Sequence, residues 1–116
     1  MALGPSLMAY DQDLAERVRA VVASEKGLAE QRMFGGLAFL IHGRMAVAAT
    51  DDGLLLRVDP RHTDELVEAP DVGRFVMRGR ELDGWLRVGA GAVATDEALR
   101  EWVAHGVRYA ASLPPK

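Results

Sequence analysis

Arg32-Met33-Phe34-Gly35-Gly36-Leu37-Ala38-Phe39 is the most informative stretch of this chain. It joins a charged residue and two large apolar residues to a glycine pair, and then to a hydrophobic run. A glycine pair at this place permits a bulge or a sharp bend where another segment passes closely. Met33 and Phe34 are expected to be core residues that close the end of a sheet. Arg32 is the residue of this stretch whose presence is least explained by packing in the core.

Further apolar segments surround this stretch and are separated by turn signals. The Asp-Gly pair at Asp52-Gly53 supplies the positive φ angle that a tight hairpin needs, and His42-Gly43-Arg44 marks another turn. We therefore expect an antiparallel meander, followed by a hairpin around a polar turn at residues 78–80. The expected strands are residues 30–34, 37–41, 45–50, 54–58, 74–77 and 84–88.

Three helices are predicted from capping residues and apolar periodicity. Asp11 is a plausible N-cap for an amphipathic helix that extends to about residue 24. Asp59-Pro60 begins a short helix that stops before Pro70, and Thr95 caps a final helix. The order is helix, strands, short helix, two strands, helix. This order predicts a two-layer α+β fold, with helices packed mainly on one face of an antiparallel sheet.

Length and composition indicate one folded domain. The chain has 116 residues, of which 49% are hydrophobic and 27% are charged, which is ordinary for a globular protein. We expect residues 1–8 to be a disordered extension or expression remnant, and residues 9–116 to be the domain. No apolar run reaches the ~18 residues of a membrane helix, and no signal-peptide pattern begins the chain. A cytoplasmic protein without membrane association is expected.

The charge balance weighs against tight autonomous DNA binding. Acidic residues number 17 and basic residues 14, so the formal charge is −3. DNA-binding proteins usually have a basic excess, because phosphate contacts dominate their affinity. Twelve of the basic residues are Arg, which suits bidentate contacts with carboxylate or phosphate. A compositional bias toward Arg explains the same excess equally well.

The predicted sheet has a second face that carries Trp and Arg. Strand alternation puts Leu55 and Arg57 opposite Leu54 and Leu56, and it puts Trp85 and Arg87 together. Trp and Arg are typical anchors of protein interfaces. The alternative is a solvated face on which Arg stems lie over Trp. The candidate interaction residues are Arg32, Arg44, Arg57, Trp85 and Arg87.

A second basic group lies in the predicted hairpin. Arg74, Arg78 and Arg80 form the densest basic cluster, which suits a phosphate, a nucleic acid or an acidic protein surface. The alternative is a solvated hairpin that Glu81 and Asp83 partly neutralise.

No residue pattern indicates catalysis. There is no cysteine, the three histidines lack partners at metal-ligand spacing, and no G-x-S-x-G motif is present. Residues 89–94 match G-x-G-x-x-A, but Asp96 and Glu97 would then face the phosphates of a dinucleotide. We therefore expect no enzyme activity, no catalytic residue, no metal and no cofactor.

From Tyr10 onward the chain resembles the N-terminal domain of the TfoX/Sxy family, the competence regulators of bacteria. The matching features are the opening helix, Arg32-Met33-Phe34-Gly35-Gly36-Leu37-Ala38-Phe39, the turn His42-Gly43-Arg44 before Met45, Leu54-Leu55-Leu56-Arg57-Val58-Asp59, Gly84-Trp85-Leu86-Arg87-Val88 and Ser112-Leu113-Pro114-Pro115-Lys116. The resemblance implies a small two-layer α/β domain and a non-enzymatic role in transcriptional control of DNA-uptake genes. Full-length competence regulators carry a second, helical domain that has no counterpart in these 116 residues.

The leading hypothesis is a regulatory protein-interaction module whose partner is another protein or a second copy, as a homodimer formed through a sheet face or edge. One alternative is weak nucleic-acid binding by the Arg-rich hairpin. The other is binding of a small molecule or anion near Arg32 and Arg57.

Overall fold

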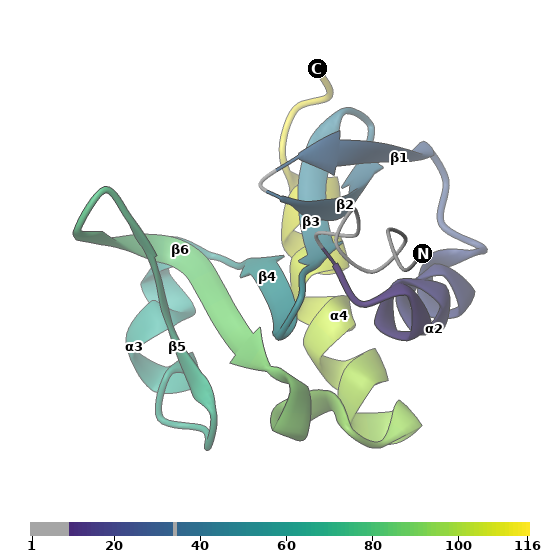
Figure 1. The fold of residues 1–116 in the computed structure, drawn as a ribbon. Helices are drawn as coiled ribbons and strands as arrows, with labels where there is room; N and C mark the ends of the chain where they lie inside the picture. Colours follow the sequence, from purple (N-terminus) through teal and green to yellow (C-terminus); the bar gives the residue numbers. More distant parts are fainter. Residues whose placement is uncertain (1–9, 34) are drawn as a thin grey trace.

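A six-stranded antiparallel sheet dominates the computed structural model, which describes residues 10–33 and 35–116. The strand order is β1-β2-β3-β4-β6-β5. Helices α2 and α4 contact β3 and each other on one face of the sheet, while α3 lies against β6 (Figure 1). This is the predicted two-layer α+β architecture. The expected extension at residues 1–8 and the expected core residue Phe34 lie outside the described residues.

Helix α2, Gln12–Val22, begins where the sequence predicts it. The Asp11 side chain accepts a hydrogen bond from the Leu14 backbone N–H at 3.1 Å, which satisfies one of the free donors of the first turn. Leu14, Val18 and Val22 recur at helical spacing and are buried against the sheet.

The first four strands form the predicted meander. They are β1 (Leu28–Met33), β2 (Gly36–Ile41), β3 (Arg44–Ala49) and β4 (Gly53–Arg57). Gly36 allows a close approach, because a Cβ atom there would lie 2.3 Å from the Ala49 backbone oxygen. The β2–β3 register shifts between Phe39 and Leu40, so β3 carries a bulge that the sequence pattern did not predict.

After β4, the short helix is split into a 3₁₀ turn, Pro60–His62, and one α-helical turn, α3 (Thr63–Leu66). Asp59 caps it by accepting the Arg61 backbone N–H at 2.9 Å. The buried Thr63 hydroxyl donates to the Pro60 carbonyl at 2.8 Å and accepts from the Gly84 backbone N–H at 2.9 Å. Thr63 thereby ties the short helix to the sheet.

Strands β5 (Val72–Met77) and β6 (Arg80–Gly89) are longer than the sequence predicted. For β6 the reason is the two-residue turn, in which Arg78 and Gly79 have φ angles of 53° and 78°, whereas β5 gains Val72 and Gly73 at its other end. Both strands therefore pair up to the turn. Their hairpin projects from the rest of the molecule (Figure 1).

A 3₁₀ turn, Ala90–Val93, leads to α4, Asp96–Ser112, whose cap is the predicted Thr95. The Thr95 hydroxyl accepts from the Ala98 backbone N–H at 3.1 Å. At Gly106 the helix lies directly on the sheet, because an added Cβ would be 2.4 Å from the Ala46 backbone oxygen. None of the helices in residues 10–33 and 35–116 has the length and apolar character that a membrane crossing requires.

Apolar side chains are buried on both faces of the sheet. The main core lies under α2 and α4 and includes Phe39, Leu56 and Val103. The opposite face has a smaller cluster, which we call the outer cluster: Ala38, Leu40, Met45, Ala48 and Leu55, packed with Met33, Phe75 and Trp85. The outer face therefore also carries a buried apolar cluster, and this cluster positions the candidate site.

Candidate interaction surface

Arg57 and Trp85 are direct cross-strand partners on β4 and β6. The Arg57 guanidinium carbon lies 4.8 Å from the centroid of the Trp85 ring and 5.5 Å from that of Tyr109 on α4. Such cation–π contacts contribute about 0.5–1 kcal/mol each at exposed sites. In the described part of the chain, no carboxylate forms an ion pair with Arg57. Two aromatic rings thus hold a cation whose planar donors can still bind an acceptor.

Arg57 and Trp85 border a groove on the outer face, with a volume of about 510 Å³. Its lining consists of Gln31, Met33, Leu40, Gly43, Arg44, Met45, Arg57, Trp85 and Lys116, and we call it the outer groove. No Asp or Glu side chain is among these lining residues. A chain with a formal charge of −3 therefore has a groove that is locally cationic and apolar.

Arg44 also fastens the C-terminal segment to the groove. Its Nε donates to the Pro114 carbonyl at 2.9 Å, and the Lys116 backbone N–H donates to the His42 carbonyl at 3.0 Å. The C-terminal segment therefore lies beside the β2–β3 turn, and Lys116 lines the groove. Arg44 has a structural contact as well as a place in the candidate site.

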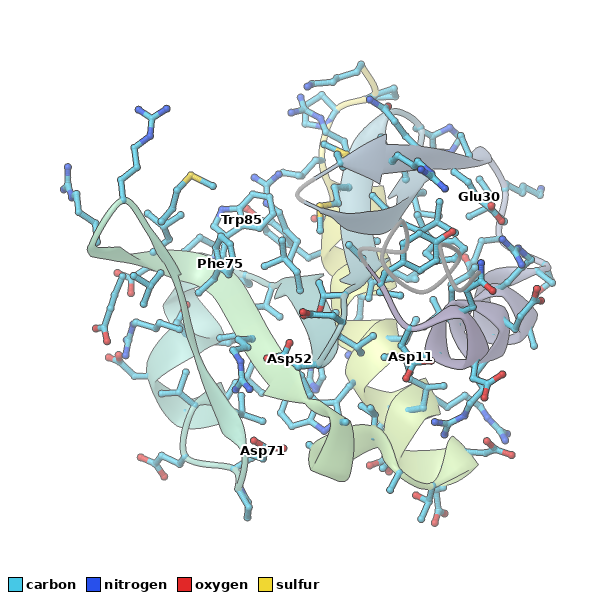
Figure 2. All side chains as sticks on the ribbon, in the orientation of Figure 1. Asp11, Glu30, Asp52, Asp71, Phe75 and Trp85 are labelled. Carbon is cyan, nitrogen blue, oxygen red and sulfur yellow. The ribbon has the colours of Figure 1, made fainter. Side chains whose placement is uncertain are left out.

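The other two predicted interaction residues lie elsewhere. Arg32 stacks over the Tyr10 ring at 5.9 Å and lines a separate hollow of about 260 Å³. Arg87 forms ion pairs with Asp52 at 3.1 Å and Asp71 at 3.9 Å. Figure 2 shows both aspartates well away from Trp85. The structure thus brings Arg44, Arg57 and Trp85 together and separates Arg32 and Arg87 from them.

The predicted basic cluster in the hairpin is also divided. Arg74 forms ion pairs with Asp83, at 2.8 Å, and with Asp64. The hydrogen bond to Asp83, and then the one to Asp64, raise the pKa of Arg74. Arg78 and Arg80 lie at the turn and form no ion pair with any described residue. Val76 beside them is 53% exposed. Within this basic cluster, the arginines that lack an ion pair with a described residue are therefore the two at the turn.

Sequence reasoning did not find Tyr109. It is far from Arg57 along the chain, and only the crossing of α4 over the sheet brings the two side chains together. No local pattern signals such a contact.

The arrangement favours binding by Arg donors and apolar contacts. Within residues 10–33 and 35–116, no three His, Asp or Glu side chains gather as metal ligands. Every buried side-chain nitrogen or oxygen in these ranges has a hydrogen-bond partner.

A comparison with known protein families identifies a family to which most of this chain is similar. The family described as the TfoX N-terminal domain matches residues 20–110, which is most of the chain. No curated protein gives a significant match.

Proposed function

Because the chain belongs to the TfoX N-terminal domain family, we propose that it is a non-enzymatic regulatory module that acts by binding another protein. In this it resembles the N-terminal domain of TfoX-type competence regulators. The outer groove is its binding surface. The partner is a protein segment that presents Asp or Glu carboxylates beside apolar side chains.

One observation carries this proposal: Arg57 is held between Trp85 and Tyr109 and has no carboxylate partner among the described residues. A guanidinium binds a carboxylate through two parallel hydrogen bonds, and Arg and Trp often contribute 2 kcal/mol or more at interface centres. The groove lacks acidic side chains that would repel such a partner.

The apolar part of the groove sets the second requirement. Met33, Leu40 and Met45 line it, and methionine adapts its shape to different apolar partners. A purely acidic segment would leave this surface uncovered. We therefore expect selectivity for peptides in which carboxylates alternate with Leu, Phe or Met side chains.

The test is fluorescence polarisation with a labelled peptide library. Peptides with acidic and apolar residues are compared with matched peptides in which Gln replaces every Asp and Glu. Arg57→Ala and Trp85→Ala should each weaken acidic-peptide binding at least ten-fold, whereas Arg78→Ala, an exposed Arg outside the groove, should leave it unchanged. Absence of binding, or equal binding by Arg57→Ala, would overturn the proposal.

Light scattering distinguishes a second copy of the chain from another protein as the partner in the groove. A dimer that Arg57→Glu dissociates would make a second copy of the chain the occupant of the groove, in place of another protein. A monomer that binds the acidic peptides supports the proposal as stated.

Weak nucleic-acid binding by the hairpin is a second candidate. It is favoured by the free cations of Arg78 and Arg80 on a projecting turn, and weakened by the pairing of Arg74 with two carboxylates. A gel shift at low salt that Arg78→Ala and Arg80→Ala abolish would support it. No shift at low salt would exclude it.

A further inference from the structure

We propose that a second cleft, separate from the outer groove, binds a small molecule with a carboxylate or phosphate group on a short apolar body. The cleft lies between the C-terminal half of α4 and residues 58–66. Its volume of about 320 Å³ suits a ligand of modest size. We call it the histidine cleft; it is lined by Val58, Asp59, His62, Leu66, His105, Arg108, Tyr109 and Ser112.

Cationic and hydrogen-bonding side chains converge on this cleft from two elements. His62 comes from the 3₁₀ turn after β4, while His105 and Arg108 come from α4. Arg108 forms no ion pair with any described residue, so its five N–H donors are available to an anion. Tyr109 lines the same space. Together these groups can bind an oxyanion by charge and by hydrogen bonds.

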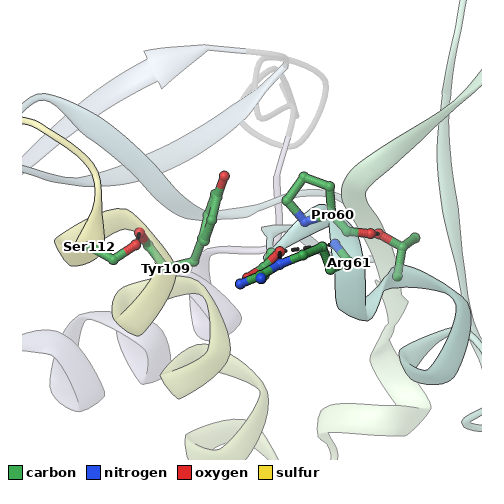
Figure 3. A network of polar contacts seen from close by, with 6 residues as sticks. Pro60, Arg61, Tyr109 and Ser112 are labelled. Carbon is green, nitrogen blue, oxygen red and sulfur yellow. Dashed lines mark hydrogen bonds and ion pairs between the residues drawn. The ribbon is translucent and has the colours of Figure 1, made fainter.

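The single carboxylate that lines the cleft is already neutralised. Asp59 accepts from Arg61 Nη2 at 2.9 Å and from Arg61 Nε at 3.2 Å, and Figure 3 shows the Arg61 side chain extending toward Tyr109 on α4. Hydrogen bonds from the Arg61 side chain and then its backbone lower the pKa of Asp59 to about 2. Asp59 therefore stays ionised at neutral pH, and Arg61 offsets its negative charge.

The surroundings of His105 are short of negative charge. Burial, followed by the positive charges of Arg108 and His62, lowers the pKa of His105, while Glu101 and Glu65 act in the opposite direction. A bound anion would add the negative charge that these glutamates supply only in part. By linkage, an anion that raises the pKa of His105 binds more tightly as pH falls through that pKa.

The floor of the cleft is apolar. Val58 is buried and Leu66 is half-buried, and both line the cleft together with the polar groups. A ligand that places an apolar body on this floor and an anionic group toward Arg108 satisfies both parts of the cleft. This chemistry fits small organic acids and organic phosphates better than inorganic ions.

Three probes separate the contribution of the anionic group from that of the apolar body. Benzoate has both, inorganic phosphate has only the charge, and benzamide has only the apolar body. The readout is the NMR signals of the His62 and His105 rings during titration. Benzoate should shift both signals saturably and raise the pKa of His105. Benzamide should bind at least ten-fold more weakly than benzoate. A stronger effect from inorganic phosphate than from benzoate would overturn the proposed contribution of an apolar body.

Two arginines of α4 provide a matched pair of variants. Arg108→Ala should weaken benzoate at least five-fold, while Arg100→Ala, on the same helix but outside the histidine cleft, should leave it unchanged. A circular dichroism spectrum identical to that of the wild type shows that Arg108→Ala still folds. The absence of a saturable shift with both anions, or equal shifts in the Arg108→Ala protein, would overturn the proposal. Neither result bears on peptide binding by the outer groove.

Discussion

At Arg57, two aromatic rings occupy the place beside a guanidinium that a carboxylate often fills. Arg87, two residues from Trp85 on β6, has the opposite surroundings, because Asp52 and Asp71 neutralise it. The difference between these two arginines lies in their neighbours and not in their residue type. It is the reason that the outer groove, and not the far end of β6, is the candidate binding surface.

Thr63 is the buried polar residue that holds the short helix to β6. Thr63→Val keeps the shape but leaves the Gly84 N–H without its acceptor, and an unsatisfied buried donor costs about 1–3 kcal/mol. We expect the free energy of unfolding in urea to fall by about that amount. Thr63→Ser, which keeps the hydroxyl, should lose clearly less. A Thr63→Val protein as stable as the wild type would show that the hydrogen bond to Gly84 does not stabilise this site.

Asp59 provides a prediction about pH. Its pKa is lowered from 3.8 to about 2, chiefly by the side-chain hydrogen bonds of Arg61. A carboxylate with a depressed pKa contributes stability that is complete above its unfolded-state pKa and is lost as pH falls through its folded-state pKa. This contribution should therefore disappear between about pH 4 and pH 2.

The corresponding variant is Arg61→Ala. It should raise the pKa of Asp59 toward its ordinary value, as measured by carboxyl-carbon NMR. The loss of folding stability between about pH 4 and pH 2 should then be smaller than in the wild type. Arg100→Ala, which does not contact Asp59, is the control. An unchanged Asp59 titration in the Arg61→Ala protein would contradict the assigned cause.

Among the elements, those with local signals were predictable. Asp11 and Thr95 are caps that act on the next three residues, so the starts of α2 and α4 follow directly from the sequence. Strand alternation also put Arg57 and Trp85 on one face correctly. The bulge in β3 and the contact of Tyr109 with Arg57 depend on how distant segments pack, and the sequence pattern contains no signal for either.

Helix α4 and strand β3 approach each other through Gly106. Gly106→Ala should improve helix propensity by about 1 kcal/mol, yet its Cβ would lie 2.4 Å from the Ala46 oxygen. The clash should dominate, because overpacking a tight contact costs about 1–3 kcal/mol. We therefore expect a lower midpoint in thermal unfolding.

A control lies on the exposed side of the same helix. Ala104→Gly should lose about 1 kcal/mol through helix propensity alone, without affecting the contact with β3. A Gly106→Ala protein more stable than the wild type would show that α4 can move away from the sheet at no cost.

On the scale of the whole molecule, the sheet separates two surfaces with different roles. One face is covered by α2 and α4 and forms the main core, while the other carries the outer cluster and the outer groove. The exposed acidic residues give the chain a net charge of −3, so an acidic partner is repelled by the molecule as a whole. Attraction must come from the local cations of the groove.

The contrast between the negative net charge and the local cations of the groove predicts how peptide affinity depends on salt. The distance over which charges act falls from ~10 Å at 0.1 M ionic strength to ~3 Å at 1 M. For an acidic, apolar peptide, affinity for the wild-type protein should fall several-fold between these conditions, because the contact with Arg57 is partly exposed. Arg57→Met, which keeps the apolar stem, should bind more weakly at 0.1 M and lose much less affinity with salt. Parallel salt dependences for the two proteins, measured by fluorescence polarisation, would show that the guanidinium of Arg57 does not meet the partner's carboxylate.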